Sequence, residues 1–232
     1  MKRTLSLLCA VMLATFVCTQ HTQAQEKETP KHWKIELSGA LNNYSAWEVE
    51  PSVTYMPLRY AGIGMGVLFS RATDGNGFNG TSQDGSLRWS TADNNALHSF
   101  FAIRPSLTFQ SPCITLGEDK DYALYLSLSP GLTLPLPANR SVDVDYIPDR
   151  AGTWIPLKTE RFHNKGGANV FYHVKSAVSL EIDETIVFSA GYTFSTYDPY
   201  DCLRHISVEG KKLNPKKQRF MHSFFISAGV RF

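Results

Sequence analysis

The last thirteen residues, Phe220 to Phe232, constrain the fold of this chain more than any other stretch. Apolar residues alternate with small or polar ones there, and Phe225 is an apolar residue out of phase with this alternation. Alternation with a period of two is typical of a β-strand with two different faces. The chain is therefore predicted to end on a strand with one apolar face. The residues expected on that face are Phe220, Phe224, Ile226, Ala228, Val230 and Phe232.

This ending resembles the C-terminal strand of bacterial outer-membrane β-barrels, which finishes with an aromatic residue, most often Phe. The resemblance implies that Phe224, Val230 and Phe232 form an assembly signal, with the barrel assembly machinery as a partner. It also implies an even number of similar strands in the rest of the chain.

Residues 1–24 have the pattern of a secretory signal peptide. Lys2 and Arg3 give it a positive start, an apolar run follows from Leu5 to Val17, and Thr22 to Ala24 form a small-x-small cleavage site. We expect cleavage after Ala24, which leaves residues 25–232 as a single barrel domain. The apolar run is shorter than the roughly 18–20 residues of a membrane helix.

The remaining chain contains seven more segments with the same alternation. We therefore predict an all-β fold, a closed antiparallel transmembrane barrel of about eight strands. Short turns alternate with long connections over residues 70–95, 137–168 and 197–218. In the second long connection, the alternation of Val142, Val144 and Tyr146 is compatible with a short hairpin. The expected strands are residues 33–38, 47–55, 61–69, 98–109, 124–136, 170–182, 186–195 and 220–232.

Charged residues lie on the polar faces of these strands, four of each sign. Small barrels fill their interior with side chains, so we expect ion pairs in the lumen. The alternative is a soluble periplasmic lipocalin-like barrel, which would bury its apolar faces and expose its polar ones. The expected lumen residues are Lys34, Glu36, Glu48, Glu50, Arg104, Lys175, Glu181 and Arg231.

The chain as a whole resembles the small OmpA/OmpX-type outer-membrane barrels. The resemblance implies short periplasmic turns, long outer loops, and a location in the outer membrane of a Gram-negative cell envelope. We favour a structural or surface-interaction role over catalysis, with lipopolysaccharide or surface molecules as partners. We expect a monomer. We expect no cofactor and no metal, because the histidines lack the spacing of metal ligands. The net charge of +2 gives no reason to expect binding to nucleic acid.

Two cysteines, Cys113 and Cys202, follow the expected signal peptide. The predicted topology places them at opposite ends of the barrel, whereas a disulfide needs Cα atoms within about 7 Å. We therefore predict two free thiols.

The third long connection suggests an alternative function. His205, Ser207, Gly210 and the Asn214–Pro215 step resemble the motif of outer-membrane lipid A deacylases, which are eight-stranded ester hydrolases. The resemblance implies that His205 is the general base and Ser207 the nucleophile, on one face of a strand. Val208 and Glu209 depart from the motif, and Glu209 is the nearest acid that could orient the histidine.

The same connection is basic. At the outer leaflet its cations would face lipopolysaccharide phosphates, although a solvated loop explains them equally well. The expected lipid-phosphate contacts are Arg204, Lys211, Lys212, Lys216, Lys217 and Arg219.

Overall fold

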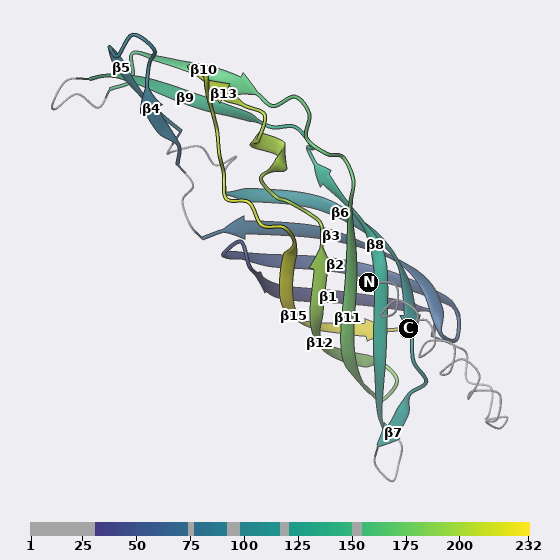
Figure 1. The fold of residues 1–232 in the computed structure, drawn as a ribbon. Coiled ribbons are helices and arrows are strands. Elements are labelled where there is room, and N and C mark those ends of the chain that lie inside the picture. Colours follow the sequence, from purple (N-terminus) through teal and green to yellow (C-terminus); the bar gives the residue numbers. More distant parts are fainter. Residues whose placement is uncertain (1–30, 74–76, 92–97, 117–120, 150–154) are drawn as a thin grey trace.

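The computed structural model describes residues 31–73, 77–91, 98–116, 121–149 and 155–232, so the predicted signal peptide lies outside the described residues. Nine strands form one antiparallel sheet, and an extra pairing of β8 with β11 closes it (Figure 1). The short strand β7 (Ile114–Leu116) pairs with β8 alone, which leaves eight strands in the wall. The predicted closed antiparallel barrel is confirmed. Its wall strands are β1 (Trp33–Asn42), β2 (Ala46–Leu58), β3 (Ala61–Ala72), β6 (Ser99–Gln110), β8 (Tyr122–Leu136), β11 (Phe171–Ile182), β12 (Ile186–Ser195) and β15 (Met221–Arg231).

The apolar faces of the wall strands point outward. On β15, Phe224 and Ile226 are 71% and 72% exposed, whereas Ser223 is 1% exposed. Phe225, the residue out of phase, points inward and is buried. An exposed apolar exterior around a polar interior is the arrangement of a transmembrane barrel. The alternative of a lipocalin-like barrel is therefore wrong. No helix among the described residues has the length and apolarity to span a membrane.

The two ends of the barrel differ. At one end, which we call the turn end, β11 and β12 join through Asp183 and Glu184, both with positive φ. Two residues with positive φ form the tight hairpin turn whose twist matches that of its strands. The described chain begins and ends at this end, because Trp33 and Phe232 pair through their backbones and the Arg231 amide donates to the Thr185 carbonyl beside this turn. The three long connections all leave the opposite end, which we call the loop end.

The long connections at the loop end fold into a second sheet, which we call the extension. Its four strands have the order β10-β9-β5-β4, and Figure 1 shows them reaching away from the barrel. The hairpin that the sequence allowed around Val144 is present and consists of β9 and β10. The expectation of a plain loop over residues 70–95 is wrong for its described part, because β4 and β5 lie there. The bounds are β4 (Asn79–Thr81), β5 (Leu87–Ser90), β9 (Ser141–Pro148) and β10 (Lys158–His163).

A hydrophobic core joins the extension to the mouth of the barrel. The third connection folds a small hairpin, β13 (Ser207–Val208) with β14 (Lys211–Lys212). The buried Val208 belongs to one hydrophobic cluster with Val144 of the extension and with Leu68 and Met221 of the wall. Burial of such side chains drives packing, so the extension and the loop end of the barrel are held together by a shared core.

Candidate ligand surface at the loop end

Arg204 ties together the two ends of the third connection. It follows the 3-10 turn η2 (Asp201–Leu203), and its Nε donates to Asp198 Oδ2 at 2.6 Å. Its Nη1 and Nη2 donate to the carbonyls of Pro215 and Lys216 at 3.0 and 2.9 Å. Charge-assisted hydrogen bonds of this kind are strong. Arg204 therefore holds the connection together, and its expected contact with lipid phosphate stays a prediction.

Asn164 joins the second connection to the third, and Asn139 supports it. Asn164 is buried, its Oδ1 accepts the His205 amide at 2.9 Å, and its Nδ2 donates to Asn139 Oδ1 at 2.9 Å. Asn139 Oδ1 also accepts the Gly167 amide at 2.9 Å. These bonds fix backbone groups that no strand satisfies. The sequence offered no signal for them, because the partners come from segments about 25 to 41 residues apart.

The structure does not pair His205 with Ser207. His205 lies in the turn after η2, and Ser207 begins β13, so the expected placement of both on one strand face is wrong. Among the described residues, no hydrogen bond joins the His205 ring to the Ser207 hydroxyl, and the ring lies beside Gly166. A nucleophile activated by a base needs that hydrogen bond. The geometry therefore provides no assembled catalytic pair here.

Glu209, the acid nearest to that motif, has another role. Its Oε1 accepts the Tyr146 hydroxyl at 3.1 Å, and its Oε2 accepts the Gln83 amide at 3.4 Å. Burial raises the pKa of Tyr146, and the Glu209 carboxylate raises it further. Glu209 and Gly210 have positive φ and form the turn between β13 and β14. Glu209 thus attaches this hairpin to β9.

The remaining cations of the connection separate into two groups. Lys211 and Lys212 lie on β14, in the part that Glu209 holds against the extension. Lys216, Lys217 and Arg219 follow it, are exposed, and lead directly into β15. Within the described chain, no ion pair neutralises these three residues. We call Lys216, Lys217 and Arg219 the rim cations.

Aromatic rings cover the outward face of the wall next to the rim cations. The pairing of β12 with β15 places Phe194 opposite His222, with ring centroids 5.6 Å apart. Phe220 packs on Phe194 at 4.8 Å, and the Arg219 guanidinium lies 5.1 Å from the Phe220 ring centroid. The Tyr192 hydroxyl is hydrogen-bonded to His222 Nδ1. We call Tyr192, Phe194, Phe220 and His222 the aromatic ledge. Aromatic residues at this level are typical of the boundary between membrane and water.

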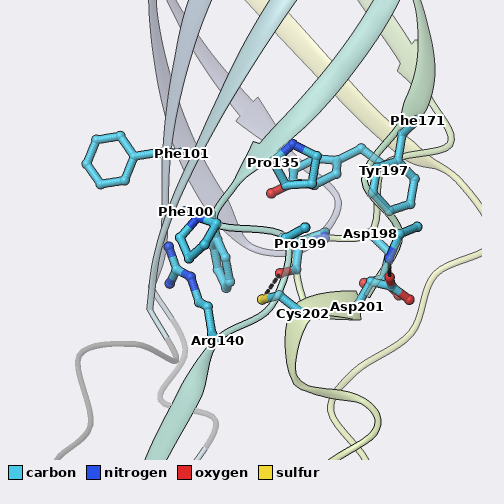
Figure 2. A pocket seen from close by; sticks show the side chains of 13 residues that line it. Phe100, Phe101, Pro135, Arg140, Phe171, Tyr197, Asp198, Pro199, Asp201 and Cys202 are labelled. Atoms are coloured by element: carbon cyan, nitrogen blue, oxygen red, sulfur yellow. Dashed lines mark hydrogen bonds between the residues drawn. The ribbon is translucent and has the colours of Figure 1, made fainter. Parts of the chain in front are cut away.

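A small pocket lies where the wall meets the second and third connections (Figure 2). Arg140 donates to the Ser99 carbonyl there, and its guanidinium lies 5.1 Å from the Phe100 ring centroid. Cys202 donates its thiol to the Pro199 carbonyl at 3.3 Å, and burial raises the pKa of this thiol to about 11. A protonated thiol is a weak nucleophile. The Cys202 thiol in this pocket is therefore a poor nucleophile at neutral pH.

Ion pairs and hydrogen bonds organise the interior of the barrel. Glu50 pairs with Arg104 at 2.7 Å and with Lys175 at 3.4 Å. The expectation of an ion pair for Glu48 is wrong among the described residues, because its carboxylate accepts from the neutral Asn42 and Ser223 at 2.6 and 3.1 Å. A polar cavity of about 50 Å³ remains beside Arg104, large enough for water. The other two interior pairs are Lys34–Glu36 at 2.9 Å and Arg231–Glu181 at 3.1 Å.

The structure also places the cysteines and the residues of the expected assembly signal. Cys113 is exposed, Cys202 is buried, and both are free thiols. Phe224, Val230 and Phe232 point outward and are exposed. In the part of the chain that the structure describes, no three His, Cys, Asp or Glu side chains are grouped to hold a metal ion.

No protein-family model and no curated protein matches the sequence. Three solved structures illustrate the similarity in fold. The N-terminal barrel domain of Pseudomonas aeruginosa OprF is 9% identical with a TM-score of 0.39, over 87% of this chain and 98% of that one. Neisserial surface protein A is 12% identical with a TM-score of 0.38, over 86% and 94%. The outer membrane enzyme PagL is 6% identical with a TM-score of 0.37, over 86% and 99%. Similarities this distant concern the fold alone, and the function has to be inferred from the residues of this chain.

Proposed function

We propose that this chain is an outer-membrane protein of a Gram-negative cell envelope that binds lipopolysaccharide phosphates at its rim and presents its extension at the cell surface. The observation that carries the proposal is the position of the rim cations beside the aromatic ledge. In this proposal the loop end faces outward and the turn end faces the periplasm. Residues 1–24 would be the export signal, and the barrel assembly machinery would recognise the C-terminal strand.

The rim cations and the aromatic ledge suit two parts of one lipid. Phosphate oxygens accept strong charge-assisted hydrogen bonds from lysine and arginine. Rings at the interface, such as Phe194 and Phe220, pack against the upper part of acyl chains. Lys211 and Lys212 lie on β14, in the hairpin that Glu209 holds against the extension, so this proposal leaves them out of the contact.

A binding measurement with matched variants tests the proposal. We expect the triple variant Lys216→Gln, Lys217→Gln, Arg219→Gln to bind lipopolysaccharide about tenfold more weakly than the wild type, with a weaker dependence on salt. Lys211→Gln with Lys212→Gln is the control, and its affinity should stay within about twofold. Dephosphorylated lipopolysaccharide should not distinguish the triple variant from the wild type. Equal affinity of the triple variant and the wild type for intact lipopolysaccharide would refute the proposal.

A further inference from the structure

The outward face of the barrel wall has a depression centred on strands β12, β15 and β1. Its floor consists of three small and exposed residues, Gly39, Ala190 and Ala228. The depression is open, mostly apolar, and has a volume of about 710 Å³. A Cβ atom added at Gly39 would meet no atom of the described residues within 4 Å, so there is open space above this residue. We call this depression the wall hollow.

The strand register joins the three small residues into one depression. Gly39 and Ala190 lie opposite Ile226 on its two sides, and Ala228 is the next outward residue of β15. Diagonal neighbours across a strand pair lie only about 7–8 Å apart, so the three small residues adjoin one another. The larger side chains that flank Ala228 on the two neighbouring strands are Leu37 and Phe188.

The wall hollow lies below the aromatic ledge on the same strands. Phe224, the next outward residue of β15 after His222, packs on Tyr192 of the ledge with ring centroids 5.1 Å apart. Ile226 follows two residues later. At about 3.4 Å per residue and a strand tilt of about 40°, Ile226 lies about 10 Å below His222. An apolar band is about 25 Å tall, so the upper part of the hollow lies in the half of the band nearer the loop end.

The rim cations favour one kind of lipid in the hollow. Lipid chains cover the wall of a transmembrane barrel, so a chain of some neighbouring lipid fills this depression. A lipid whose phosphates bind Lys216, Lys217 and Arg219 holds its own acyl chains along the ledge below them. Such tethering raises the effective concentration of these chains at the hollow above that of unbound lipids. A chain that lies in a depression also makes more dispersion contacts than a chain on a convex wall.

We propose that the wall hollow seats an acyl chain of the lipopolysaccharide molecule whose phosphates bind the rim cations. This inference rests on the proposed function, because the bound phosphates position the chain. The ligand is then a phosphorylated and acylated glycolipid, recognised by charge at the rim and by shape in the hollow. A molecule that has only one of these two parts binds more weakly.

A variant with a filled hollow tests this inference. Protein in phospholipid nanodiscs is titrated with intact lipopolysaccharide, and with lipopolysaccharide that has lost its fatty acids but keeps its phosphates. We expect Gly39→Leu with Ala190→Leu to bind the intact form at least about threefold more weakly than the wild type, because the added side chains occupy the hollow. Its affinity for the deacylated form should stay within about twofold of that of the wild type, since the rim is distant from the hollow.

The control variant enlarges two outward side chains on the far side of the barrel. Ile63 on β3 and Leu107 on β6 lie opposite each other and are both exposed. In the closed wall, three strands separate β6 from β15 in either direction. Ile63→Phe with Leu107→Phe should therefore bind both forms of lipopolysaccharide within about twofold of the wild type.

A crosslinking measurement on the wild type does not depend on these variants. Lipopolysaccharide with a photoactivatable diazirine on its acyl chains is bound to the protein and irradiated, and the labelled peptides are identified by mass spectrometry. We expect the label on the β1 and β15 peptides that contain Gly39 and Ile226. Labelling spread evenly around the wall overturns the inference.

The outcomes separate this inference from the proposed function. The role of the hollow is overturned if the filled variant binds intact lipopolysaccharide as tightly as the wild type, or if it binds both forms more weakly by the same factor. Equal affinity of the wild type for the two forms also overturns it, and leaves the proposed function standing when the triple variant of the rim cations binds both forms more weakly. Intact lipopolysaccharide that the triple variant binds as tightly as the wild type overturns the proposed function, and this inference with it.

Discussion

Arg104 Nη1 lies 2.7 Å from Glu50 Oε2 inside the barrel, between strands β6 and β2. The two side chains are 3% and 9% exposed, and Lys175 approaches the other Glu50 oxygen at 3.4 Å. One buried carboxylate therefore balances two cations. Removing it would leave both charges without their partner in a medium that solvates them poorly.

Replacing Glu50 with Ala should destabilise the barrel by about 3–5 kcal/mol, because a buried charge without its partner is costly. The measurement is the free energy of unfolding in urea, with the protein inserted in lipid vesicles. Glu160→Ala breaks the exposed pair with Lys158 and should cost less than about 1 kcal/mol. Equal losses in the two variants would contradict an interior held by ion pairs.

Replacing Arg204 with Ala should loosen the third connection. The change removes the bond to Asp198 and the bonds to two backbone carbonyls, and Asp198 stays buried without its cation. We expect subtilisin to cut between η2 and β15 about tenfold faster than in the wild type, since cleavage follows local opening. Lys212→Ala, on the exposed face of β14, is the control. An unchanged cleavage rate would show that Arg204 does not hold the connection.

The two thiols should react at very different rates. Cys113 is exposed, whereas Cys202 is buried with a pKa raised to about 11, so almost none of it is thiolate at pH 8. With iodoacetamide at pH 8, we expect one residue to be modified in the folded protein and two after unfolding. Mass spectrometry of the peptides identifies the sites, and rapid labelling of Cys202 in the folded protein would disprove its burial.

Asp84 should stay ionised in unusually acidic solution. In the β4–β5 turn it accepts the Ser82 and Ser86 hydroxyls at 2.5 and 2.7 Å, and these bonds lower its pKa from 3.8 to about 2. A lowered pKa in the folded state means that the stabilisation is present above about pH 4 and is lost as the pH falls towards 2. Carboxyl chemical shifts against pH measure this titration. Ser82→Ala with Ser86→Ala should return the midpoint to its ordinary range.

The barrel was predictable from sequence because its strands are long and alternate. On β15, the alternation places Phe224 and Ile226 on one face of the strand and Ser223 on the other. Of the extension, only the β9–β10 hairpin left such a signal, in the alternation of Val142, Val144 and Tyr146. β4 has three residues and β13 has two, so neither shows a period. The burial of Val208 on β13 depends on segments far away in the chain, and the hydrogen bond between Glu209 and Tyr146 joins the same hairpin to β9.

The roles of residues in the candidate site could not be predicted from the sequence either. Charge alone marked Arg204 as a surface cation, but its partners Asp198, Pro215 and Lys216 turn it inward. The spacing of His205 and Ser207 predicted one strand face, yet η2 places the histidine in a turn. Side-chain roles in long connections depend on tertiary contacts, which local spacing does not contain.

The most direct test of the membrane barrel is heat-modifiable migration of the protein from isolated outer membranes on a denaturing gel. A closed barrel with its apolar face towards lipid resists detergent until it is boiled. We predict an outer-membrane band that migrates faster unboiled and shifts after boiling to a position below 26.0 kDa, the mass of the chain with its signal peptide. A protein found in the soluble periplasmic fraction, with the same migration before and after boiling, would contradict the membrane barrel and every proposal that depends on it.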